Sequence, residues 1–196
     1  MVWKNDQVSE KETEKILELA RAEVRGKGDF VEFGCYKGDT SLLLSEVLRG
    51  TGRRLWIYDS FEGLPEKSEA DESTLGEDFR GGELFITKRM VKERFLRANL
   101  PIPVIKKGWF RDLGEEDLPE RISFAFLDGD FYESIRDSFR LVSSKMCDGG
   151  VIIIHDYRNL ALPGVKRAVD EWLRENGDKY EAESYQSMII LRKRLV

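Results

Sequence analysis

Short apolar runs that alternate with helix-like segments constrain the fold of this chain more than any other feature of its sequence. The runs have the length of buried β-strands and lie at residues 30–33, 55–58, 103–105, 123–127 and 151–154. Strands that alternate with helices predict an α/β, doubly wound fold, in which a mostly parallel sheet is covered by helices on both faces. Residues 180–184 and 187–191 are expected to add an antiparallel pair near the C-terminus.

Capping residues and glycines mark where the helices between these runs begin and end. Ser9 and Glu12 form a capping-box pattern, which predicts a first helix within the N-terminal segment 1–28. Further helices are expected at about residues 39–49, 84–98 and 163–176. The helix before the fifth run is expected to carry Met146 on its apolar face and to be broken by Gly149 and Gly150.

The composition suits one globular domain spanning residues 1–196. Hydrophobic residues make up 41% and charged residues 35%, a balance that argues against disorder. No apolar run approaches the roughly 20 residues needed to cross a bilayer, and no secretory signal is evident, so we expect a cytoplasmic protein without a membrane partner. The net charge of −5 argues against nucleic acid as a main partner. The acidic, aperiodic segment 65–83 is expected to be a loop or lid.

The turn after the first apolar run carries a binding signal. Gly34 and Gly38 let the backbone turn tightly and approach a ligand, and the next helix points free N–H groups at that site. The turn is not the G-x-G-x-x-G dinucleotide pattern, because Tyr36 and Asp39 stand where glycines are needed. Glu32 would repel a pyrophosphate and attract an ammonium group. S-adenosylmethionine fits, since its amino-acid end has both an ammonium and a carboxylate; a plain strand-turn-helix is the alternative.

Aspartates follow three of the five predicted strands, at Asp59, Asp128 and Asp156. Asp59 is placed to accept hydrogen bonds from ribose hydroxyls, a feature of both nicotinamide and methyl-donor enzymes. Asp128 and Asp156 end strands that should be neighbours, and their carboxylates would repel each other unless a cation lay between them. Magnesium prefers such oxygen ligands. In the alternative interpretation, one carboxylate caps a helix and the other binds the methyl donor.

Four blocks of the sequence match one known pattern in the same order. They are D-S-F-E-G-L-P at 59–65, G-W-F at 108–110, L-D-G-D-F-Y-E-S at 127–134, and D-Y at 156–157 followed by P-G-V-K-R-A-V-D at 163–170. Together they resemble the macrocin O-methyltransferase (TylF-type) family of S-adenosylmethionine-dependent methyltransferases, over about residues 32–172. The resemblance implies a seven-stranded class I methyltransferase (Rossmann-like) fold with an antiparallel C-terminal strand. It also implies methyl transfer to a hydroxyl of a small molecule, commonly a sugar or phenolic natural product.

The glycine turn and the resemblance together assign site residues. Those expected to contact S-adenosylmethionine are Glu32, Gly34, Cys35, Tyr36, Gly38, Thr40, Ser41, Asp59, Ser60, Phe61, Gly108, Trp109 and Asp128. The family implies a bound magnesium ion, which Asp128, His155 and Asp156 would hold. Phe61 is expected either against the adenine ring or in the core.

His155, the only histidine of the chain, departs from the family pattern, which usually has aspartate at that position. Because imidazole suits manganese or zinc better than magnesium, those ions are alternatives to magnesium. In a second interpretation no metal is bound, and His155 or Asp128 is the general base. In a third, His155 is a partly buried histidine bound to a backbone carbonyl.

Two further classes of function stay open, a non-catalytic S-adenosylmethionine-binding module and, last, a nicotinamide oxidoreductase. Relatives of this type tend to carry more chain before the first strand than the 29 or so residues found here. We therefore expect an acceptor pocket that is either more open or completed by the second subunit of a homodimer.

Overall fold

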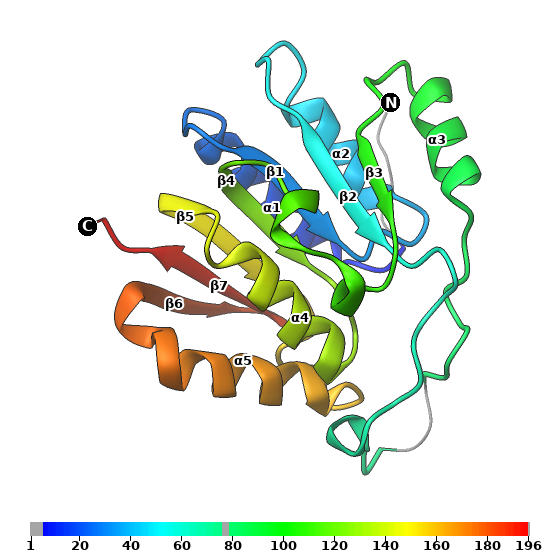
Figure 1. Cartoon of the computed structure of the whole chain (residues 1–196), viewed down its shortest axis with the longest axis vertical. Coiled ribbons are helices and arrows are strands. Elements are labelled where there is room, and N and C mark those ends of the chain that lie inside the picture. The colour runs from blue at the N-terminus through cyan, green and yellow to red at the C-terminus, as the bar shows by residue number, and fades with distance from the viewer. Residues whose placement is uncertain (1–5, 76–78, 196) are drawn as a thin grey trace.

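The computed structural model of the chain describes residues 6–75 and 79–195. The strands are β1 (Asp29–Phe33), β2 (Leu55–Asp59), β3 (Val104–Lys107), β4 (Ile122–Leu127), β5 (Met146–Ile154), β6 (Tyr180–Tyr185) and β7 (Met188–Lys193). In the described residues they form one seven-stranded sheet in the order β3-β2-β1-β4-β5-β7-β6, as Figure 1 shows.

The sheet has the direction pattern expected from the sequence. β3, β2, β1, β4 and β5 are parallel, and β7 runs antiparallel to both β5 and β6. The strand order reverses between β1 and β4, which is where ligands bind in open α/β sheets. The predicted doubly wound, mostly parallel sheet with an antiparallel C-terminal strand is confirmed.

Helices cover both faces because residues alternate along each strand. The helices are α1 (Glu10–Glu23), α2 (Asp39–Val47), α3 (Lys88–Arg97), α4 (Tyr132–Val142) and α5 (Pro163–Asn176). Val31 and Phe33 share a buried cluster with side chains of α4 and α5, which lie in front of the sheet in Figure 1. Phe30 belongs to a second cluster with side chains of α1, α2 and α3. Full burial of side chains of this size contributes about 1.5–3 kcal/mol each.

Two predicted element boundaries were wrong. α4 ends at Val142, and Met146 begins β5, where it pairs with Ile122. Gly149, with φ of +78°, lies in this strand next to a register irregularity, so β5 bends through the glycines instead of starting after them. α3 begins at Lys88 rather than near residue 84, because the Thr87 side chain accepts a hydrogen bond from the Met90 N–H and caps the helix.

The segment between β2 and α3 runs beyond the carboxyl ends of the strands (Figure 1). Residues 76–78 of the predicted loop at 65–83 lie outside the described residues, as do residues 1–5 of the predicted N-terminal segment. Asp71 anchors the loop: it is buried, and its Oδ1 accepts a hydrogen bond of 2.7 Å from the Tyr132 N–H at the start of α4.

Across residues 6–75 and 79–195, none of the helices combines the length and apolar character needed to cross a membrane.

Candidate active site

The carboxyl ends of β1, β2, β4 and β5 lie side by side. Register pairs join Phe33 to Tyr58, Phe33 to Leu127, and Leu127 to Ile154. Hydrogen bonding continues one residue past these strands: the Gly34 N–H donates to Tyr58, the Asp128 N–H to Phe33, and the His155 N–H to Leu127. The residues just after the strands are thereby held at one edge of the sheet, as the parallel arrangement predicted.

A cavity of about 1090 Å³, part of it open to solvent, lies at this edge. Most of the residues predicted from the sequence to bind the cofactor or a metal line it. They are Glu32, Gly34, Cys35, Tyr36, Thr40, Asp59, Ser60, Trp109, Asp128, His155 and Asp156.

Gly38, Ser41, Phe61 and Gly108 were also predicted to contact the cofactor but are not among the lining residues. Gly38, with φ of +80°, is the N-cap of α2. Ser41 donates a hydrogen bond to Glu32 from behind the cavity wall. Phe61 is buried in the cluster with α1, α2 and α3, and the Gly108 N–H donates to the Asp59 carbonyl. These four residues support the lining residues from outside the cavity.

Several lining residues were not singled out from the sequence. Phe110, Asp130 and Ser134 belong to the quoted sequence blocks, so the blocks contained the signal although no role was given to them. Gln7 and Asn159 also line the cavity. Nothing in the sequence marked these two, since only the folded chain brings them to the strand ends.

Gly34 allows β1 and β4 to approach each other closely. Its φ is +83°, and a Cβ atom there would lie only 1.9 Å from the carbonyl oxygen of Asp128. No side chain fits at that distance, so glycine is required both for the left-handed backbone and for the contact. Glycine is therefore needed at position 34 because of the contact with Asp128, a requirement that a plain strand-turn-helix would not impose.

Asp59 organises the loops on either side of the cavity. One carboxylate oxygen accepts hydrogen bonds from the N–H groups of Cys35 (2.9 Å) and Tyr36 (3.3 Å). The other accepts from the Phe61 N–H at 2.7 Å. Since Tyr36 and Phe61 both have positive φ, the carboxylate stabilises two loop conformations that are otherwise strained. Asp59 therefore has a structural role besides the ribose contact expected from the sequence.

Glu32 is a buried carboxyl group on the cavity wall. Burial raises the pKa of Glu32 to about 8, and the charges of Asp128 and Asp59 add to this although the hydrogen bond from Ser41 opposes it. The carboxyl group is therefore protonated at neutral pH in the absence of a nearby cation. Burial likewise raises the pKa of the Cys35 thiol well above its usual value, so Cys35 is no thiolate nucleophile.

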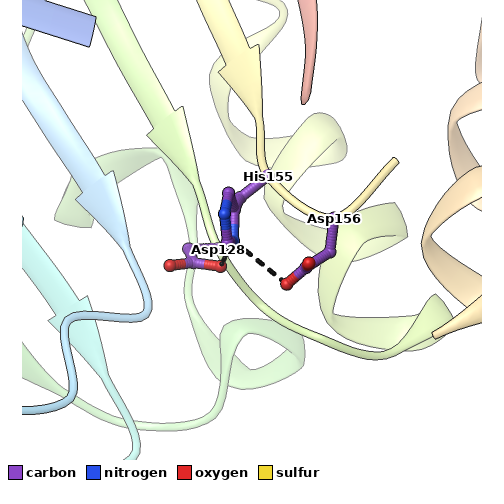
Figure 2. A group of neighbouring side chains, drawn as sticks. All are labelled: Asp128, His155 and Asp156. Carbon is purple, nitrogen blue, oxygen red and sulfur yellow. Dashed lines mark hydrogen bonds and ion pairs between the residues drawn. The ribbon is translucent and has the colours of Figure 1, made fainter. Parts of the chain in front are cut away.

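Asp128, His155 and Asp156 form a compact group at the ends of β4 and β5, shown in Figure 2. His155 Nδ1 lies 3.0 Å from Oδ1 of Asp128 and 3.0 Å from Oδ2 of Asp156. Burial alone would lower the pKa of His155, but the charge of Asp128 and the contacts with both aspartates outweigh it and raise the pKa well above its usual value. The ring is thus held as an imidazolium between two carboxylates.

The same group has a donor set that suits a divalent cation. One ligand atom from each residue lies within 4.8 Å of the others. Neighbouring ligands of an octahedral ion lie about 3 Å apart, which matches the two distances from Nδ1. Two carboxylates and one imidazole bind magnesium, manganese or zinc, with the imidazole favouring the latter two. A metal at this position would replace the Nδ1 proton.

Strained backbone residues gather around the cavity. Of the seven non-glycine residues with positive φ in the described chain, four line it, namely Tyr36, Leu84, Asp130 and Asp156. Such conformations cost on the order of 1 kcal/mol or more each, and they persist mainly where function requires them.

Burial and the charges of Asp128 and Asp156 raise the pKa of Asp130 well above its usual value, which adds a second perturbed carboxyl group to the site.

This fold, with its site at the ends of β1, β2, β4 and β5, is that of the class I O-methyltransferases. The solved structure of the O-methyltransferase NovP superimposes with a TM-score of 0.82 over 94% of this chain and 80% of that one, at 26% identity. The calicheamicin methyltransferase CalS11 shares the fold, with a TM-score of 0.76 over 93% of this chain and 78% of that one, at 17% identity.

The chain belongs to the macrocin-O-methyltransferase (TylF) family, whose model matches residues 10–185. A tetracenomycin relative from Streptomyces olivaceus, 8-demethyl-8-(2,3-dimethoxy-alpha-L-rhamnosyl)-tetracenomycin-C 4'-O-methyltransferase, is 34% identical over 154 residues, or 74% of this chain and 58% of the relative. Demethyldecarbamoylnovobiocin O-methyltransferase from Streptomyces niveus is 30% identical over 153 residues, again 74% and 58%. The match thus spans less than two thirds of these relatives. The resemblance found in the sequence is confirmed.

Proposed function

We propose that this protein is an S-adenosylmethionine-dependent O-methyltransferase that methylates a hydroxyl of a small molecule, either a sugar-bearing or a phenolic natural product. The observation that carries the proposal is one cavity at the switch point of the sheet, with Glu32 and Asp59 on one side and the Asp128–His155–Asp156 group on the other. Family membership and the names of the relatives, all O-methyltransferases, support it. We infer a single catalytic domain over residues 1–196.

The cofactor is proposed to lie along β1 and β2. Glu32 would face its ammonium group, while Gly34 and the backbone N–H groups at the start of α2 would face its carboxylate. Asp59 and Ser60 would accept and donate hydrogen bonds at the ribose. Trp109, which lines the same cavity, would contact the adenine ring.

Asp128, His155 and Asp156 are proposed to hold a divalent metal ion, magnesium first and manganese or zinc as alternatives because of the imidazole. When bound, such an ion supplies Lewis acidity that lowers the pKa of the acceptor hydroxyl. The three side chains would also fix the place of the acceptor relative to the cofactor, since they follow β4, which pairs with β1, and β5, which pairs with β4.

The residue that takes the acceptor proton is proposed to be a carboxylate. His155 and Asp128 were both considered from the sequence, but with a metal on Nδ1 and a proton on Nε2 the His155 ring would have no free lone pair to accept a proton. Asp128 and Asp130 remain as candidates, since both line the cavity.

The reaction can be tested with labelled S-adenosylmethionine and a panel of sugar-bearing and phenolic natural products, with mass spectrometry of the products. We expect one acceptor class to gain a single methyl group, and Asp128→Asn to abolish the gain. Asp148→Asn, at an exposed position of β5, is the matched control. Retained activity in excess chelator would select the metal-independent mechanism. Cofactor binding without transfer to any acceptor would favour a non-catalytic binding module.

A further inference from the structure

The second ring nitrogen of His155 faces a carboxylate that belongs to neither the cofactor nor the metal group. His155 Nε2 lies 3.9 Å from Oε2 of Glu12, in the first turn of α1. Both side chains are buried, with 7% and 6% of their surfaces exposed. Because Nδ1 faces Asp128 and Asp156, the imidazole ring lies between the two aspartates on one side and Glu12 on the other.

We propose that Glu12 is a positioning residue that holds His155 with Nδ1 toward the metal and Nε2–H toward α1. This inference rests on the metal site of the proposed function. A metal-bound imidazole must coordinate through one nitrogen and carry its proton on the other, and that second N–H commonly meets a carboxylate. In the described chain, Glu12 is the carboxylate found on the Nε2 side of the ring.

Glu12 is suited to this role because hydrogen bonds from two sides fix its own position. Oε2 accepts hydrogen bonds from the N–H (3.2 Å) and hydroxyl (2.6 Å) of Ser9, closing the capping box of α1. Oε1 accepts from the N–H (2.9 Å) and hydroxyl (2.5 Å) of Ser187, in the turn between β6 and β7. The carboxylate therefore joins α1 and the C-terminal hairpin directly behind the metal ligand.

The capping box alone does not account for this arrangement. A capping glutamate ordinarily lies at the surface and binds the backbone of its own helix. Here the carboxylate is buried, uses its second oxygen for a residue 175 positions away, and faces the only histidine of the chain. Each of these features is expected of a carboxylate that orients a metal-bound histidine through its second ring nitrogen.

The test is Mn²⁺ affinity, measured by calorimetry on the untagged chain of residues 1–196. Glu12→Gln keeps an oxygen for Ser187 but loses the charge that faces Nε2, and we expect it to weaken Mn²⁺ binding about 10-fold or more. Glu18→Gln is the matched control: it makes the same change at an exposed glutamate of α1, so it should keep Mn²⁺ affinity within about twofold.

A spectroscopic readout is independent of affinity. His155 is the only histidine, so a long-range ¹H–¹⁵N spectrum of the Zn²⁺-loaded protein contains one imidazole ring. We expect the proton on Nε2 and the metal on Nδ1. Unchanged Mn²⁺ affinity in Glu12→Gln, or coordination through Nε2, would overturn the role of Glu12. If the wild-type protein binds no metal, the metal site fails as well, and binding of S-adenosylhomocysteine in the same sample shows whether the cofactor part of the proposed function stands.

Discussion

Replacing Gly34 with alanine should destabilise the protein more than the same change at Gly50 or Gly38, although all three glycines have nearly the same backbone angle. Their φ values are +83°, +77° and +80°. A left-handed conformation costs an alanine about 1–2 kcal/mol. A Cβ atom at Gly50 meets nothing within 4 Å, and at Gly38 it makes an ordinary contact at 3.4 Å, so these two variants should lose only that amount.

At Gly34 the added Cβ would lie 1.9 Å from the Asp128 carbonyl oxygen, so the ends of β1 and β4 must separate. Overpacking of this kind costs about 1–3 kcal/mol. Separation of the strands would also weaken the hydrogen bond from the Asp128 N–H to the Phe33 carbonyl, which adds about 1 kcal/mol. We therefore expect Gly34→Ala to lower the free energy of unfolding by about 3–6 kcal/mol in all, measured by urea denaturation.

The variant should also lose affinity for S-adenosylhomocysteine, since the displaced strand ends form the cavity, whereas Gly50→Ala should bind it normally. If Gly34→Ala and Gly50→Ala had equal stability and equal affinity, the close approach of the two strands would be refuted.

Three further predictions concern the acidic residues of the cavity. Burial raises the pKa of Glu32 from 4.5 to about 8 on folding, so the folded state binds the extra proton and the contribution of Glu32 to stability falls as pH rises from about 4.5 towards 8. Glu32→Gln should remove this dependence from a series of urea denaturations, and an identical pH profile would refute the buried, protonated carboxyl group. Asp59→Asn replaces the carboxylate that accepts hydrogen bonds from three backbone N–H groups, which should lower the free energy of unfolding by about 1–3 kcal/mol. Unaltered stability would mean that the two loops hold their conformations without the Asp59 carboxylate. Asp128→Asn should weaken Mn²⁺ binding by about 10-fold or more in calorimetry, and full retention of affinity would exclude Asp128 as a ligand.

Much of the fold was predictable because local signals and burial agreed. The apolar runs that became β4 and the end of β5 are buried on both faces of the sheet, so their residues had to be apolar at consecutive positions. The wrong boundary at Met146 has the opposite cause. Its spacing continued a helical pattern, but pairing with Ile122 across the sheet outweighed the local preference.

The candidate site was predictable where a residue follows a strand directly. Asp59, Asp128 and His155 were found in this way, because parallel strands bring their carboxyl ends together. Glu12 and Gln7 were not found, since their place beside the site depends on how α1 packs against the sheet, which no local pattern specifies. The role of Asp59 in binding backbone N–H groups was also hidden, because it depends on loop conformations with positive φ.

Titration calorimetry with S-adenosylhomocysteine measures whether this cavity binds a methyl-donor cofactor. We propose that the cofactor lies between Glu32 and Asp59 in the cavity at the switch point of the sheet. We therefore expect saturable binding to one site per chain, both with manganese and with chelator, and weaker binding by Glu32→Gln. Absence of binding under every condition would contradict the methyltransferase assignment of this cavity.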